Sequence, residues 1–164
     1  MNIRGSRTLD APRADVFAAI FDPTTLLAVI PGCREIEQVG DGEYRGRISL
    51  RLPGVVGSYR TVVRVVSADA PGAGELEGEV TGALGSIIGR ASFRLAEAAG
   101  RTQVEYEGTA RIGGPLARLD SRFVEGIAGS LIGQGLQNLN VRLQGARSAG
   151  SEQNRRQATK EIQP

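Results

Sequence analysis

Histidine and tryptophan are absent from this sequence, and cysteine occurs once, as Cys33. Without histidine the chain lacks the side chain that most often exchanges protons near neutral pH, so general acid–base catalysis is disfavoured. One cysteine and no histidine also exclude the usual zinc and copper sites. A lone cysteine excludes an internal disulfide and fits the reducing conditions of a cytoplasmic compartment. The composition therefore predicts a protein that is neither an enzyme nor a metalloprotein.

Long apolar runs and clusters of basic residues are missing too. No segment of about 18 apolar residues occurs, so we expect no bilayer span. Residues 1–20 contain arginines and aspartates instead of an apolar core, so we expect no secretory signal. The net charge is only +2, and the aromatic residues are three tyrosines and four phenylalanines. A weak, dispersed charge with so few aromatic rings predicts no nucleic-acid partner.

The order of the expected elements is a strand at residues 3–9, two short helices, six further strands and a long helix. Asp10 and Asp22 each precede a proline, which is typical of a capped helix start. Alternating apolar residues between glycine- and proline-containing turns then predict strands that pair as an antiparallel meander. These strands are expected at residues 33–39, 43–52, 58–68, 75–81, 86–96 and 101–112.

The long helix is expected over residues 115–143, where apolar side chains recur every three or four positions. Its centre contains Gly126, Gly129, Gly133 and Gly135, and each glycine costs about 1 kcal/mol relative to alanine. The missing side chains allow two interpretations: close packing of the helix on the sheet, or room for a guest molecule. The polar segment 145–164 predicts a disordered tail.

A curved antiparallel sheet that wraps around a long helix leaves a pocket between the two. Strand alternation places arginines and glutamates outside, and aliphatic residues, glycines and hydroxyls inside. With no histidine, acid or lysine on the inner face, we expect an uncharged pocket that holds an apolar molecule and performs no chemistry. The candidate ligand-binding residues are Tyr44, Ile48, Leu50, Tyr59, Thr61, Val63, Val80, Ala91, Phe93, Tyr106, Phe123, Gly126, Gly129 and Gly133.

Three of these candidates, Tyr44, Tyr59 and Tyr106, combine an apolar ring with a hydroxyl and are expected to hydrogen-bond a polar headgroup. The turns at one end of the sheet are unusually apolar. They either cover the pocket mouth and the start of the long helix, or form a docking surface for a membrane or a partner protein. This expected rim consists of Val55, Val56, Leu84, Ile87, Ile88 and Leu116.

Four segments carry a resemblance to a known family. They are Ile30-Pro31-Gly32-Cys33 ahead of Glu35, the turn at 40–44, Gly57-Ser58-Tyr59, and the glycine-rich run at 106–117. Together with the element order they resemble the carbon monoxide dehydrogenase G-subunit (CoxG) family of the helix-grip superfamily, also called START/Bet v 1-like or SRPBCC. The resemblance covers residues 1–143. It implies an α+β fold in which a seven-stranded curved antiparallel sheet surrounds the C-terminal helix, with residues 1–144 as a single domain and 145–164 as the tail.

The resemblance also implies a function. Family members are accessory proteins of molybdenum-containing CO dehydrogenase-type hydroxylases, implicated in recruiting the enzyme to the cytoplasmic membrane and in handling quinones. For this chain it implies a non-enzymatic protein with no covalent cofactor, a bound quinone or lipid-like ligand, and a cytoplasmic location with peripheral contact at the inner membrane. Gly129 and Gly133 would make room for the ligand's tail, so Gly129→Leu is expected to abolish ligand uptake.

Two alternatives remain open from the sequence. The chain could be an assembly or maturation factor that binds its partner hydroxylase by protein contacts and has an incidental cavity. A cyclase or hydrolase, as in other branches of the superfamily, would need an acid or base inside the pocket. Family members that anchor to the bilayer use an extended apolar C-terminal tail, whereas this tail ends in the polar Gln163-Pro164.

Overall fold

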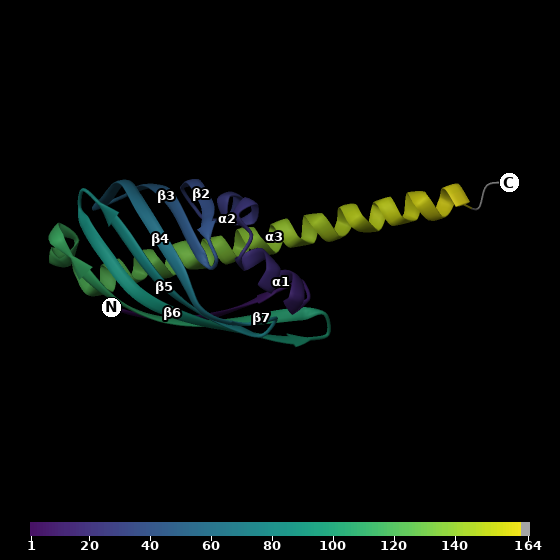
Figure 1. Ribbon diagram of the computed structural model, residues 1–164, viewed down its shortest axis with the longest axis horizontal. Coiled ribbons are helices and arrows are strands. Elements are labelled where there is room, and N and C mark those ends of the chain that lie inside the picture. The colour runs from purple at the N-terminus through teal and green to yellow at the C-terminus, as the bar shows by residue number, and fades with distance from the viewer. Residues whose placement is uncertain (162–164) are drawn as a thin grey trace.

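The computed structural model describes residues 1–161 and shows a seven-stranded antiparallel sheet curved around one long helix (Figure 1). The strand order is β1-β7-β6-β5-β4-β3-β2, so β2 to β7 form the expected meander and β1 pairs with β7. This confirms the α+β helix-grip architecture. The strands are β1 (Asn2–Leu9), β2 (Cys33–Gly40), β3 (Glu43–Leu52), β4 (Val55–Asp69), β5 (Ala73–Gly82), β6 (Gly85–Ala98) and β7 (Arg101–Gly113).

The hairpins follow from local turn chemistry, although β4 begins three residues and β5 two residues earlier than expected. Leu52 pairs with Val55, so Pro53-Gly54 forms a two-residue turn and β4 starts immediately after it. Gly54 has a φ of +79°, a conformation that strains any residue with a Cβ atom. Gly42, with a φ of +65°, completes the β2–β3 turn in the same way.

Two short helices, α1 (Arg13–Ile20) and α2 (Pro23–Val29), follow β1. Asp22 caps α2, since its Oδ2 accepts hydrogen bonds from the Thr25 N–H at 3.2 Å and the Thr25 hydroxyl at 2.6 Å. The expected cap at Asp10 is wrong, because the residue preceding α1 is Pro12 and no side chain caps that helix. The Asp10 carboxylate instead accepts hydrogen bonds from Arg101 and from α3, which begins 111 residues after it.

The long helix differs from its expected bounds at both ends. Residues Gly114–Arg118 form a 3-10 helix, η1, and α3 runs from Ser121 to Glu161. Asp120 accepts a hydrogen bond from the Arg122 N–H and so begins the helix. Residues 145–161 of the segment expected to be a disordered tail continue α3, because their alanines, glutamines and arginines favour helix. Gln163-Pro164 lies outside the described residues.

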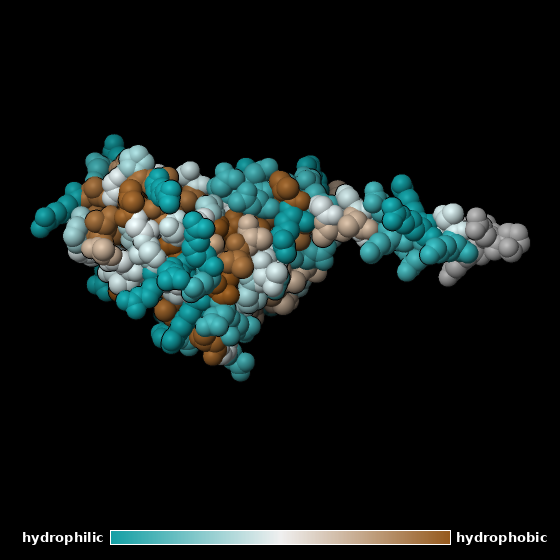
Figure 2. All heavy atoms as spheres, turned by 90° about the horizontal axis from the view of Figure 1, so that it is seen from above, coloured by the Kyte–Doolittle hydropathy of each residue, from teal (hydrophilic) through white to brown (hydrophobic). Residues whose placement is uncertain are grey.

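The helix projects well beyond the sheet (Figure 1). Every residue from 144 to 160 is exposed, and hydrophilic residues dominate this segment in Figure 2. No helix in residues 1–161 carries an apolar stretch long enough to cross a bilayer.

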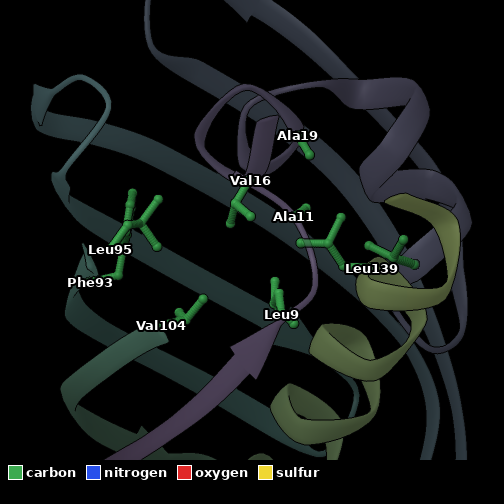
Figure 3. Packing of buried hydrophobic residues seen from close by; sticks show 9 residues of the cluster. Leu9, Ala11, Val16, Ala19, Phe93, Leu95, Val104 and Leu139 are labelled. Atoms are coloured by element: carbon green, nitrogen blue, oxygen red, sulfur yellow. The ribbon is translucent and has the colours of Figure 1, made fainter. Parts of the chain in front are cut away.

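The hydrophobic core consists of two separate clusters. In the first, side chains from β1, α1, β6, β7 and α3 point toward one another, as Figure 3 shows for Leu9, Val16, Leu95, Val104 and Leu139. The second contains Val55, Tyr59 and Leu116 at the end of the sheet where η1 lies.

Polar contacts hold α3 against one edge of the sheet. Arg7 Nη1 donates to the Gly133 carbonyl at 2.5 Å, and Asn138 Nδ2 donates to the Val29 carbonyl at 2.9 Å. Asn140 Oδ1 accepts from the Asp10 N–H at 2.8 Å. The helix therefore packs on β1 and α2. Part of the inner face of β3 and β4, including Ile48, Thr61 and Val63, is left to face α1 and α2.

Candidate functional site: an apolar cavity under the first two helices

A cavity of about 210 Å³ lies between the α1–α2 pair and the inner face of β2 to β5. The two helices contribute Ile20, Phe21, Leu26 and Ile30, and almost all of the surface exposed inside the cavity is apolar, although Glu35, Arg45 and Arg47 also line it. Gly46 also lies in the wall, where a Cβ atom would come within 2.6 Å of the Glu35 carbonyl oxygen, so this glycine allows β2 and β3 to approach closely. The strands contribute Cys33, Ile36, Tyr44, Gly46, Ile48, Thr61, Val63, Val65 and Leu76.

Two hydroxyls on the inner face of β4 are the notable polar atoms near this cavity. Thr61 lines it, and Tyr59 lies two residues earlier, opposite the cavity residue Ile48 on β3. Thr61 Oγ1 and Tyr59 OH are both buried, and neither has a hydrogen-bond partner within residues 1–161. Burial also raises the pKa of the Tyr59 phenol, so the hydroxyl keeps its proton at neutral pH. Thr61 Oγ1, in the cavity wall, is thus free to donate to an acceptor on a ligand, whereas Tyr59 OH is unpaired outside that wall.

The other two tyrosines expected to bind a headgroup are used differently. Tyr44 lines the cavity, but its hydroxyl donates to the Phe21 carbonyl at 2.8 Å and ties β3 to the end of α1. Burial, and secondarily the Asp22 carboxylate, raises the pKa of this phenol. Tyr106 packs beside the first core cluster, where its ring lies over Gly5, outside the cavity wall.

The sequence-predicted ligand residues are thus divided among several places. Tyr44, Ile48, Thr61 and Val63 line the cavity. The rest lie elsewhere. Leu50, Tyr59 and Val80 belong to the second core cluster, Phe93 and Tyr106 belong to the first, Ala91, Phe123 and Gly126 are exposed, and Gly129 and Gly133 are half-buried on α3.

No residue of α3 lines this cavity, although the sequence pattern predicts a pocket between the sheet and that helix. The reason is the position of α3 over β1 and α2, which long-range polar contacts determine. Sequence reasoning accordingly missed the wall that α1 and α2 form. The apolar residues of these helices were a usable signal, because Phe17, Ile20 and Phe21 are spaced as one apolar stripe, and two of them, Ile20 and Phe21, line the cavity.

Charged groups are present near the inner face, which corrects the expectation of an uncharged interior. Arg7 lies on the inner face of β1 with Val104 opposite it on β7, and it is partly buried against α3. Glu35 and Arg47 also line the cavity, but they form an ion pair at 2.5 Å and their side chains are about half exposed. We infer that the cavity mouth lies beside this pair, at the edge strand β2.

Cys33 lies on the cavity wall and is half-buried. Its Sγ donates to the Glu35 carbonyl at 3.4 Å. Burial raises the pKa of the thiol, so the protonated and less reactive form dominates at neutral pH. Since Cys33 is the only cysteine in the chain, it is a specific chemical reporter of this cavity.

Larger hollows occur on the outer face of the sheet, the largest with a volume of about 760 Å³. Its walls include Arg4, Glu75, Arg94 and Glu105, so charges of both signs line it. Exposed ion pairs such as Arg4–Glu107, at 3.2 Å, cross the same surface. These features are typical of a solvated sheet face, so the smaller apolar cavity is the better candidate for a ligand site.

Most residues of the expected apolar rim pack in the core and do not form an exposed surface. Val55, Leu84, Ile87 and Leu116 all belong to the second core cluster. Of the remaining two rim residues, Val56 is 61% exposed and Ile88 is 50% exposed. Ile88 lies on β6 opposite Glu79 and Arg111, along the strand from the turn, so the six residues do not form one continuous surface.

Comparisons with known proteins agree with this fold. The solved structure of a conserved protein from Geobacillus kaustophilus has a TM-score of 0.85 and 24% identity, covering 89% of this chain and 97% of that one. A START superfamily protein from Mycobacterium smegmatis has a TM-score of 0.70 and 10% identity, covering 88% and 98%. At such identities the likeness shows the fold alone. A search of curated proteins found no match.

The profile of one family matches most of the chain, from residue 5 to residue 144. The matched segment includes every strand that lines the cavity, both short helices and the first part of α3. The chain therefore belongs to the carbon monoxide dehydrogenase G-subunit (CoxG) family.

Proposed function

We propose that this protein is a non-enzymatic accessory protein of a CO dehydrogenase-type molybdenum hydroxylase. It binds a hydrophobic ligand, a quinone or a lipid-like molecule, and helps couple or recruit the enzyme to the membrane. Family membership supports the link to the hydroxylase. The observation that carries the binding role is the apolar cavity with the unpartnered hydroxyl of Thr61 in its wall.

The size of the cavity limits how the ligand binds. At about 210 Å³ it is smaller than the roughly 300–1,000 Å³ of pockets that enclose whole drug-sized ligands. A ring or a short alkyl segment enters it, and the rest of a long molecule leaves past the mouth beside Glu35 and Arg47. Thr61 donates a hydrogen bond to an acceptor such as a ring carbonyl, which relieves the burial of one unpaired hydroxyl.

The wall of the cavity supports binding more than catalysis. Its titratable thiol and phenol, Cys33 and Tyr44, have pKa values that burial raises. Both are therefore protonated at neutral pH, and neither is a ready nucleophile or base.

Mass spectrometry of an organic extract of the purified protein tests the binding role. We expect a lipophilic molecule with a carbonyl- or hydroxyl-bearing head, and we expect Val63→Phe, which fills the cavity, to yield none of it. An extract without any lipophile from protein purified under mild conditions would contradict the proposal.

A second candidate, an assembly or maturation factor with an incidental cavity, is favoured by the projecting part of α3. Residues 144–160 are exposed on all sides and polar, as an unpartnered contact helix would be. Pull-down of the hydroxylase separates the two functions. If deletion of residues 148–164 abolishes capture while Val63→Phe has no effect on enzyme coupling, the assembly function is supported and the ligand-binding function is not.

A further inference from the structure

Three connections gather at one end of the sheet and form a single surface. We call it the tip surface, and it comprises residues 50–57, 82–86 and 113–123. The Leu116 N–H donates to the Leu84 carbonyl at 2.8 Å, which joins η1 to the β5–β6 turn. A Cβ atom on Gly54 would lie 3.6 Å from the Phe123 ring, so the β3–β4 turn touches the start of α3.

The tip surface exposes apolar side chains. Val56 is 61% exposed and Phe123 is 43% exposed, and Pro53 and Pro115 beside them are exposed as well. Figure 2 shows brown, hydrophobic spheres at this end of the molecule and hydrophilic ones along the projecting helix at the other end. Turns are ordinarily polar, so an aromatic and an aliphatic side chain held in water here need a partner surface.

The charges around these side chains have one sign. The tip surface contains Arg51, Arg118 and Arg122, all exposed and without an ion pair among residues 1–161. Its one acid, Asp120, caps α3 by accepting from the Arg122 N–H at 2.8 Å. The opposite end of the sheet carries charges of both signs, with Asp41 and Asp69 near Arg13 and Arg101. The tip surface is therefore apolar and mainly basic.

We propose that the tip surface docks on the anionic phospholipid surface of a bilayer. Val56 and Phe123 enter the interfacial layer, and the three arginines lie at the level of the lipid phosphates. In this orientation the projecting part of α3 points away from the bilayer, toward solvent and a partner enzyme (Figure 1). The inference rests on the proposed function, whose membrane step it assigns to a defined surface.

A bilayer fits these features better than a protein partner does. The apolar side chains are few, they lie on or beside tight turns, and the three surrounding arginines outnumber the one acid of the same surface, Asp120. Membrane binding by insertion of a few side chains and by attraction to anionic headgroups requires only exposed apolar residues and nearby cations. A stable protein interface needs about 800 Å² on each partner.

Vesicle binding by the full chain tests the docking surface. We expect sedimentation with vesicles of phosphatidylcholine mixed with phosphatidylglycerol, weak binding to phosphatidylcholine alone, and release by high salt. Arg51→Glu with Arg122→Glu should weaken binding by at least about tenfold. Arg155→Glu with Arg156→Glu makes the same change of charge on the projecting helix and should leave binding intact. Equal loss in both pairs, or no binding to anionic vesicles, overturns the proposal.

A second readout uses the absence of tryptophan from the chain. Phe123→Trp places a single fluorophore in the tip surface, and Ile88→Trp places one at an exposed aliphatic position on the outer face of β6. Anionic vesicles should shift the emission of the first variant to shorter wavelength and leave the second unchanged. A shift at residue 88 alone, or binding only in the presence of the hydroxylase, overturns the proposal.

The ligand content of the same preparations separates this inference from the proposed function. If vesicle binding is absent while a lipophile is extracted, the docking surface is wrong and the ligand-binding role stands. If vesicles bind but no lipophile is found, the docking surface stands and the ligand-binding role is contradicted.

Discussion

Tyr59 and Thr61 lie two residues apart on the inner face of β4, and both hydroxyl oxygens are buried without a hydrogen-bond partner in residues 1–161. Leaving one such group unpaired costs about 1–3 kcal/mol. A ligand that accepts a hydrogen bond from either hydroxyl would recover part of this energy. An unpaired hydroxyl thus lowers the stability of the ligand-free protein and favours a ligand that carries a hydrogen-bond acceptor.

Removing either unpaired hydroxyl should not destabilise the ligand-free protein. We expect Tyr59→Phe and Thr61→Val to keep the free energy of unfolding or raise it by up to about 1 kcal/mol. Thr61→Val should also weaken the binding of a polar-headed ligand by about tenfold, the equivalent of one hydrogen bond of about 1.4 kcal/mol. Urea denaturation and ligand titration measure the two effects.

Tyr44→Phe is the matched control, because the Tyr44 hydroxyl donates to the Phe21 carbonyl. It should lower the free energy of unfolding by about 1 kcal/mol. Equal destabilisation by Tyr59→Phe would mean that the Tyr59 hydroxyl has a partner in the folded protein, which would contradict its being unpaired.

The cavity should accept a larger side chain that the core rejects. Val63→Phe adds its ring to the empty space of the cavity and should change the melting temperature little. Val104→Phe adds the same ring to a residue that is 3% exposed in the first core cluster. Overpacking there should lower the free energy of unfolding by about 1–3 kcal/mol. Equal losses in the two variants would show that the space beside Val63 is already filled.

The glycines of α3 give a test of where the ligand lies. A Cβ atom on Gly129 would meet no atom within 4 Å among the described residues. We expect Gly129→Ala to raise the free energy of unfolding by about 1 kcal/mol through helix propensity. Because α3 does not line the cavity, Gly129→Leu should leave ligand uptake unchanged, which revises the expectation from sequence.

Gly82→Ala is the control for Gly129→Ala, because it adds the same methyl group at a glycine that has no space for it. Its Cβ atom would lie 2.7 Å from Tyr59 Cδ1 and 2.9 Å from the Ser58 carbonyl, so the substitution should destabilise the protein. If Gly129→Leu folds normally but no longer binds ligand, the ligand site lies against α3 and this prediction is contradicted.

Asp10 makes stability depend on pH. The hydrogen bond from Arg101, then that from Asn140, holds the pKa of Asp10 below its ordinary value of 3.8. A carboxyl whose folded-state pKa is depressed contributes stability that is present above its unfolded pKa and is lost as pH falls through the folded one. Asp10→Asn should therefore flatten the fall in unfolding temperature below about pH 4.

Asp41→Asn, on an exposed turn residue, is the control and should leave that pH dependence unchanged. An identical acid profile for wild type and Asp10→Asn would contradict the role of Asp10 in holding α3 to the end of β1.

The sheet could be predicted from sequence because its signals are local. Alternation along β3 to β7 and turn glycines such as Gly42 and Gly54 define each hairpin within about ten residues. The position of α3 could not be predicted in the same way. It depends on Arg7 meeting Gly133 and on Asn138 meeting Val29, pairs that are 126 and 109 residues apart.

Only part of the candidate site could be predicted, because strand alternation is a local signal and the helices that cover the sheet are not placed by it. Strand alternation placed Ile48, Thr61 and Val63 on the inner face, where they line the cavity. It did not reveal that α1 and α2 cover that face. Nor did it distinguish Tyr44, whose hydroxyl is bonded, from Tyr59, whose hydroxyl is not, since the difference is the position of one carbonyl at Phe21.

Alkylation of Cys33 is the most direct test of the central claim that this cavity holds a lipophilic ligand. The chain has one cysteine, and it lies in the cavity wall. We expect a long-chain quinone to slow the reaction of Cys33 with N-ethylmaleimide several-fold in protein stripped of ligand, and to have no effect in Val63→Phe. An unchanged alkylation rate in protein shown by mass spectrometry to carry the quinone would place the ligand elsewhere and contradict the account.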